Sequence, residues 1–381
     1  MLKGIYLTIM VGPVIPVPIP KVALDALQSI QINVYAQPKQ QSGFRLEFSL
    51  ANNSPLQTIF LLAGGASLVP FLRVILMATI NGIPNVLMDG VITKVDVAPG
   101  GSSSEYSKLT VTGVDLTAMM DFLPFDGLPY PAMPIEARVL AILAKYAFLG
   151  IIPVVIPTIL LDVPIPTENI PRQQGTDYKY ITQLADDCGY IFYITPGPAP
   201  GTNTAYFGPE VKVGVPQSAL NINMDAHTNV ESLSFSFNSE GATLPIFFVQ
   251  LDELGIPLAI PVPLPSVSLL QPPLGVIPPI PKNIELMDDT ANLSLAEAAM
   301  RGLTLAGRSQ DAVTANGSLD VVRYGSPLSA RQLVGVRGAG MAFDGLYYVT
   351  SVTHDIKLGE YKQNFTLSRN ALVSITPTVP A

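Results

Sequence analysis

Prolines interrupt the longest apolar stretches of this chain and limit the helices that it can form. The chain has 36 prolines in 381 residues. Its longest uncharged stretch, residues 254–281, reads LGIPLAIPVPLPSVSLLQPPLGVIPPIP and exceeds the roughly 20 residues of a membrane-spanning helix. Each interior proline costs a helix about 3 kcal/mol and a hydrogen bond that lipid cannot replace. We therefore expect no membrane span, and predict an extended, polyproline-like strap lying in a groove of this chain or of a neighbour.

Two other proline-rich apolar stretches are expected to behave similarly. Residues 11–20 are predicted to form a strap, and residues 151–166 a packed strap or a pair of short strands. The first 21 residues place Lys3 before an apolar run, as a signal peptide does, but their prolines argue against secretion. The four Asn-x-Ser/Thr triplets would be glycosylation sites only in a secreted protein, so we read them as chance occurrences.

Strict alternation of polar and apolar residues predicts strands through most of the chain. Near the end, residues 364–368 alternate as Asn, Phe, Thr, Leu and Ser, the period of a half-buried strand. A turn at Gly359 would pair Leu346 to Asp355 with Glu360 to Arg369 as a hairpin. Similar patterns between residues 31 and 122 indicate four or five antiparallel strands, which favours a small barrel or sandwich.

Three segments change to a helical period. Residues 134–148 begin with proline and repeat apolar side chains on one face. A second helix is predicted from an N-cap at Thr176 to a stop at Gly189, with Cys188 facing inward. A third is predicted to start at Asn292 or Ser294.

These patterns predict a mainly β fold with an α/β insert, built from two small β-barrel domains. The first barrel, with its proline-rich extension, is assigned to residues 1–130 and the insert to residues 131–215. The second barrel is assigned to residues 216–250 and 310–381, and residues 251–309 form a proline-rich strap and helix.

Composition favours a component of a larger assembly. Hydrophobic residues make up 48% of the chain and charged residues 13%, so apolar surface is expected to be covered by other subunits. The net charge of −8 argues against a nucleic-acid-binding surface, although an acidic channel past which DNA or protein slides stays compatible with it. A single cysteine excludes a disulfide framework within the chain.

Residues that could carry catalysis are few and scattered. The two histidines, His227 and His354, have no partner at metal-ligand spacing, and their nearest carboxylates are Asp225 and Asp355. Cys188 lies in no motif for a nucleophile, and GVRGAGMAFDG has the wrong glycine spacing for a dinucleotide or phosphate loop. Adjacent carboxylates point apart and make poor acid–base partners; such pairs occur at Asp186–Asp187, Asp252–Glu253 and Asp288–Asp289. We therefore predict no enzyme, and no catalytic, cofactor or metal site.

The order of elements and several segments resemble the baseplate hub family of contractile tails. That family includes the phage late control D protein, the T4-type hub and the hub half of VgrG spikes. The resemblance rests on LMDGVITKVDV, LTVTGVDLTAMMDF, TDYKYITQLADDCGYIFYI, AYFGP and FDGLYYVTSVTHDIKLGEYKQNFTLSRNAL. The proline-rich stretches are not part of the family pattern.

The resemblance implies a structural role. Two barrels per chain would assemble as a homotrimer with six similar barrels in a ring, which adapts a three-fold spike to the six-fold tail tube. The expected partners are a spike on a separate polypeptide, inner tube and tube-adaptor proteins, and baseplate wedge proteins. The expected location is a phage tail baseplate or an injection-system particle, assembled in the bacterial cytoplasm.

Two other classes remain open. A carbohydrate- or receptor-binding tail protein would use exposed aromatic residues, for which Tyr347 and Tyr348 are the only adjacent tyrosines. A tail-associated cell-wall hydrolase would need a carboxylate or metal cluster in a cleft, for which the sequence offers no candidate.

Overall fold

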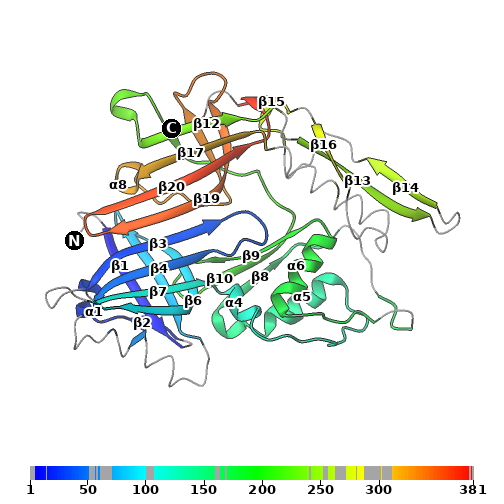
Figure 1. Cartoon of the computed structure of the whole chain (residues 1–381), viewed down its shortest axis with the longest axis horizontal. Coiled ribbons are helices and arrows are strands. Elements are labelled where there is room, and N and C mark those ends of the chain that lie inside the picture. The colour runs from blue at the N-terminus through cyan, green and yellow to red at the C-terminus, as the bar shows by residue number, and fades with distance from the viewer. Residues whose placement is uncertain are drawn as a thin grey trace.

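Strands of both halves of the chain join in one sheet (Figure 1). This computed structural model describes residues 5–13, 15–50, 56, 59–60, 71–99, 107–158, 164–167, 170–239, 242–251, 256–261, 272–279, 281–286, 302, 311–376 and 379. The sheet has 13 strands in the order β12-β17-β20-β19-β3-β4-β7-β6-β5-β1-β2, with β11 and β18 off this path. Their bounds are β1 Ile5–Gly12, β2 Val17–Pro18, β3 Leu27–Tyr35, β4 Gly43–Leu50, β5 Arg73–Ile80, β6 Ile83–Ala98, β7 Ser107–Asp115, β11 Gln217–Asn221, β12 Val230–Phe237, β17 Val313–Asp320, β18 Leu333–Arg337, β19 Gly345–Lys357 and β20 Glu360–Arg369.

Alternation in the sequence sets the two faces of this sheet. In β4, Phe44, Leu46 and Phe48 are buried while Arg45 between them is exposed. The predicted terminal hairpin is confirmed, because β19 pairs antiparallel with β20 up to Lys357 opposite Glu360. Gly359 closes the turn at a φ of 88°, a left-handed conformation that favours glycine. The apolar faces share one core that includes residues of β1, β3–β7 and β17–β20.

Two barrels were predicted from the sequence, but the described residues form no closed barrel. Instead, β3 pairs antiparallel with β19 over seven residues, from Ser351 opposite Tyr35 to Lys357 opposite Ser29. This pairing joins strands of the two predicted barrels edge to edge. Two open strand edges pair because their backbone N–H and C=O groups would otherwise lack partners.

The predicted α/β insert contains a separate small sheet and its own apolar cluster. Strands β8 (Ile151–Val155), β10 (Asn203–Gly208) and β9 (Ile191–Pro196) lie in that order, and α5 (Ile135–Ala144) and α6 (Asp177–Asp187) lie beside them (Figure 1). The Thr176 side chain accepts a hydrogen bond from Lys179 N, and Gly189 follows the helix at a φ of 68°. Both predicted helices are confirmed, and Cys188 is buried. The domain boundaries themselves stay a prediction.

Parts of the proline-rich stretches form strands, which differs from the straps predicted at 11–20 and 254–281 and agrees with one of the two alternatives for 151–166. β14 (Ile256–Pro261) pairs antiparallel with β13 (Ala242–Leu251), and β16 (Pro281–Leu286) lies parallel to β13 on its other side. β15 (Gly275–Ile277) pairs with β21 (Leu372–Ser374), and β8 occupies the start of the stretch at 151–166. Proline fits such edge strands because its missing N–H can face away from the ladder. The rest of the 254–281 strap and the helix predicted after Asn292 lie outside the described residues.

The other helices whose bounds lie within the described residues are short. They are α1 (Lys21–Asp25), α4 (Thr117–Met120) and α8 (Val321–Tyr324), with 3-10 turns η2 (Ala147–Leu149) and η3 (Asp225–His227). Of the helices that the structure describes, none is long and apolar enough to span a membrane.

The 13-stranded sheet contains the same arrangement of strands twice. The first unit has the order β3-β4-β7-β6 and the second the order β12-β17-β20-β19. In each, the fourth strand in space is the long one, and its first part pairs with an extra strand, β5 or β18. Each long strand shifts register midway, at Ile92/Lys94 in β6 and at Val349/Ser351 in β19. A strand upstream of each unit, β1 or β11, also pairs with that extra strand, antiparallel in the first unit and parallel in the second.

Candidate functional surface

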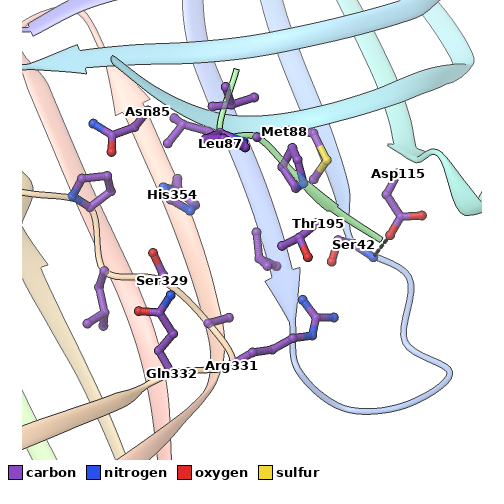
Figure 2. A pocket seen from close by; sticks show the side chains of 18 of the residues that line it. Ser42, Asn85, Leu87, Met88, Asp115, Thr195, Ser329, Arg331, Gln332 and His354 are labelled. Atoms are coloured by element: carbon purple, nitrogen blue, oxygen red, sulfur yellow. Dashed lines mark hydrogen bonds between the residues drawn. The ribbon is translucent and has the colours of Figure 1, made fainter. Parts of the chain in front are cut away.

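A cavity of about 360 Å³ lies where the two units and the insert meet (Figure 2). Its walls come from the start of β6, the end of β9 and the loop at residues 327–332, with Ser42, Asp115 and His354 from the central sheet. Figure 2 shows His354 and Asp115 on opposite sides of this cavity. Its lining includes His354, one of the residues that the sequence offered as a candidate for chemistry.

His354 is held in the core as a neutral side chain. Its Nδ1 lies 2.7 Å from the Tyr361 hydroxyl and 3.3 Å from Gln363 Nε2. Burial lowers the pKa of His354 to about 4, and burial also raises the pKa of Tyr361. Gln363 in turn exchanges hydrogen bonds of 2.8 and 2.9 Å with the backbone of Leu328. The group ties the terminal hairpin to the 327–332 loop, and the raised pKa of Tyr361 keeps its hydroxyl protonated beside the histidine.

Asp115 and Arg331 fix the other side of the same cavity. Asp115 accepts hydrogen bonds from the backbone N–H groups of Ser42 at 3.1 Å and Thr117 at 3.0 Å. Burial raises the pKa of Asp115, and burial lowers the pKa of Arg331. The Arg331 guanidinium lies 4.2 Å from the centre of the Tyr193 ring and donates to the Tyr35 carbonyl. These contacts connect the second unit to the insert and to β3.

A buried ion pair that the sequence analysis did not identify also joins the insert to the sheet. Arg73 on β5 donates to both carboxylate oxygens of Asp89 on β6, at 2.8 and 2.6 Å. Arg73 also donates to the Leu149 carbonyl at 2.8 Å, and Asn203 donates to Asp89 at 2.9 Å. The available signal was a single arginine within the apolar run VPFLRVILMATI, since a buried charge needs a partner.

The other residues considered from the sequence do not come together. His227 is exposed on η3 beside Asp225, far along the chain from buried Cys188, and Asp186 forms an ion pair with Lys39 at 2.7 Å. Asp252–Glu253 and Asp288–Asp289 lie outside the described residues. Within the described part of the chain, no three His, Cys, Asp or Glu side chains are grouped as metal ligands would be. Tyr347 and Tyr348 are both buried, so this pair does not form an exposed aromatic platform.

A polar face extends over both four-stranded units, on the side turned away from their apolar core. On the second unit it is a shallow trough of about 380 Å³ lined mainly by uncharged hydroxyl and amide side chains, which include Ser232, Ser234, Asn316, Ser318, Thr353, Asn364 and Thr366. These groups bond to one another across strands, as Ser232 does to Ser318 at 2.8 Å and Thr366 to Asn316 at 2.9 Å.

On the first unit the same face carries paired charges. Glu47 on β4 lies 3.0 Å from Arg45 and 2.9 Å from Lys108 on β7. The hydrogen bond from Lys108 lowers the pKa of Glu47. At the junction of the units, Thr353 donates to Asn33 at 2.9 Å, so the polar face is continuous from one unit to the other.

Solved structures with a similar fold are tail proteins and secretion-system components. No family model and no curated protein matches the chain. A tail protein from Neisseria meningitidis MC58 matches with a TM-score of 0.59 and 14% identity, over 96% of this chain and 97% of that one. The 43 kDa tail protein of prophage MuSo2 from Shewanella oneidensis matches with a TM-score of 0.60 and 15% identity, over 96% and 98%.

A third match extends the comparison beyond phages. The Escherichia coli c3393 protein, a type VI secretion component described as similar to the T4 tail proteins gp27 and gp5, matches with a TM-score of 0.51 and 11% identity. That match covers 93% of this chain and 76% of the other. At these identities the likeness concerns the fold. The chain therefore has the fold of these tail proteins and of this type VI secretion component, as the resemblance in its sequence predicted.

Proposed function

We propose that this chain is the structural baseplate hub of a contractile phage tail or of a phage-derived contractile injection system. Its role would be to adapt a three-fold spike to the six-fold tail tube. The observation that carries the proposal is the repeated four-stranded unit, because three copies of a chain with two such units present six similar units. The near-complete overlap with two tail proteins of similar length supports it.

The proposal includes its partners and location. The spike would bind as a separate protein, and tube, tube-adaptor and wedge proteins would surround the hub in the baseplate. Among the described residues, no group of three or more metal-ligand side chains supports a metal-dependent cell-wall hydrolase, and the one adjacent tyrosine pair is buried. Neither the hydrolase nor the receptor-binding alternative therefore has a specific observation in its favour.

The test is the mass of the purified protein in solution, followed by class averages in an electron microscope. We expect three times the chain mass of 40.6 kDa, and particles with six lobes around a central channel. Expression together with a spike protein should raise the trimeric fraction, because a ligand that binds only the assembled form shifts the equilibrium toward it. A chain that stays monomeric alone and with its spike, or that forms an assembly without three-fold symmetry, contradicts the proposal.

A further inference from the structure

The two four-stranded units together form a series of eight strands from β12 to β6. Within the described residues, this series has one unpaired strand edge at each end. At one end, β12 pairs with β17 on one side only. At the other end, β6 pairs with β5 only up to Val91, and beyond its bulge the described residues pair it only with β7. Neither edge contains a proline, but the end of β6 carries a bulge and an exposed ion pair between Lys94 and Asp96 at 2.8 Å. An open strand edge is a template for another strand, and such features limit which strand can pair with it.

The chain already shows how such an edge is covered. Inside the chain, the second unit's long strand β19 passes its bulge and pairs with β3, the first strand of the other unit. The end of β6 corresponds to that part of β19, and β12 corresponds to β3. We infer that the end of β6 in one copy of this chain pairs with β12 of the next copy, so that a second copy repeats the internal junction. The inference rests on the proposed function and adds its subunit contact.

Strand directions permit this pairing. Every neighbouring pair from β12 to β6 is antiparallel. Because the series from β12 to β6 holds an even number of strands, its two outer strands run in opposite directions. Copies related by rotation about an axis along the strands would therefore meet with β6 antiparallel to β12, and such head-to-tail contacts close into a ring.

The internal junction also gives the register. The first residues after the bulges, Lys94 and Ser351, correspond, and so do Ser232 and Ser29. The pairs between β19 and β3 can therefore be applied to the end of β6 and to β12 of the next copy. They place Val95 opposite Phe237, Asp96 opposite Ser236, and Val97 opposite Phe235. Apolar side chains thus meet apolar ones on one face, and polar ones meet on the other. Asp96 and Ser236 take the places of Thr353 and Asn33, which are hydrogen-bonded at 2.9 Å.

Burial agrees with this assignment. At the internal junction, Ile30, Ile32 and Val352 are 2%, 0% and 1% exposed. At the outer edges, Val97 is 44% exposed, and Val95 and Phe235 are only partly buried against the core. The second copy would cover these apolar side chains as the internal junction covers its own.

Disulfide cross-linking tests the register. Opposed residues of antiparallel strands have Cβ atoms about 4.5–5.5 Å apart, close enough for a disulfide after a small adjustment. The double variant Asp96→Cys with Ser236→Cys should give covalent dimers and closed trimers on a non-reducing gel after mild oxidation. The matched control, Asp96→Cys with Ser232→Cys, is displaced by roughly 13 Å along the strand and should stay unlinked. Native Cys188 is buried and is kept in both proteins.

A second pair of variants tests the edge without cysteines. Val97→Lys should weaken assembly by about tenfold or more, because it places a charge opposite Phe235. Ile83→Lys, at the far, 66% exposed end of the same strand, should leave assembly unchanged. Trimers that form without the specific cross-link and tolerate Val97→Lys would overturn this inference and leave the proposed hub intact. A chain that never assembles would overturn both.

Discussion

Buried His354 should make the stability of this protein depend on pH. The pKa of His354 is lowered by burial to about 4, compared with 6.5 for an ordinary histidine. The unfolded chain therefore binds a proton at this residue below pH 6.5, whereas the folded chain does so only near pH 4. The contribution of His354 to the free energy of unfolding is fully present above pH 6.5 and is lost as the pH drops from 6.5 to 4.

The size of this effect follows from the two pKa values. At 1.36 kcal/mol for each pH unit, the full difference corresponds to about 3 kcal/mol, most of which is lost by pH 4.5. The variant His354→Gln keeps a polar, neutral side chain beside Tyr361 and should lack this contribution. At pH 7 it should be less stable than the natural chain by roughly 1–3 kcal/mol, because its buried hydrogen bonds are disturbed.

The assay is urea unfolding followed by circular dichroism between pH 7 and pH 4.5. The difference in stability between the natural chain and His354→Gln should shrink or reverse as the pH falls, while carboxylates common to both cancel. Replacing the exposed histidine with His227→Gln should reproduce the natural profile. If the curves of the natural chain and His354→Gln stay parallel over this range, the imidazole accepts its proton in the folded state and the reasoning is refuted.

Three further changes test other parts of the fold. Asp89→Ala should lower the free energy of unfolding in urea by about 3–5 kcal/mol, because it leaves Arg73 charged and buried. The double variant Arg73→Met with Asp89→Leu should recover much of this loss. Equal losses in both variants would contradict the role of the ion pair. Thr176→Ala should destabilise the insert by about 1–2 kcal/mol in urea unfolding, because it removes the α6 cap and the hydrogen bond that the Thr176 hydroxyl donates to Asp121, whereas Thr182→Ala, which removes only hydrogen bonds to helix carbonyls, should cost less. Gly359→Ala should cost about 1 kcal/mol because the turn needs a positive φ, and Gly359→Asn should cost less; a neutral Gly359→Ala would show that the hairpin turn has rearranged.

Local features were predictable from the sequence because their causes are local. Alternation around Phe365 set the faces of β20, and Thr176 and Gly189 set the ends of α6. The position of β3 beside β19 was not predictable, because alternation specifies which side of a strand is buried and does not specify its neighbour. Residues such as Gln31 and Asp355 meet across 324 positions of sequence.

The apolar prolines and the buried polar groups were harder to interpret. An extended proline-rich segment has nearly the same local backbone preferences whether it packs as a strap or pairs as an edge strand. Residues 256–261 form the strand β14 because β13 lies beside them as a pairing partner. Similarly, His354 looked isolated in the sequence because Leu328, which anchors its neighbour Gln363, comes from a loop 35 residues away from that glutamine.

Covalent linkage of the two four-stranded units lets them differ. The first unit is followed by the α/β segment, and the second contains the β13–β14–β16 sheet between its first and second strands. In a ring of three chains, every such addition would recur at alternate positions, so an inner wall of six nearly equal sectors would carry an outer surface of only three-fold periodicity. A symmetry mismatch would then be resolved within each polypeptide, and a single substitution could alter one set of sectors without touching the other.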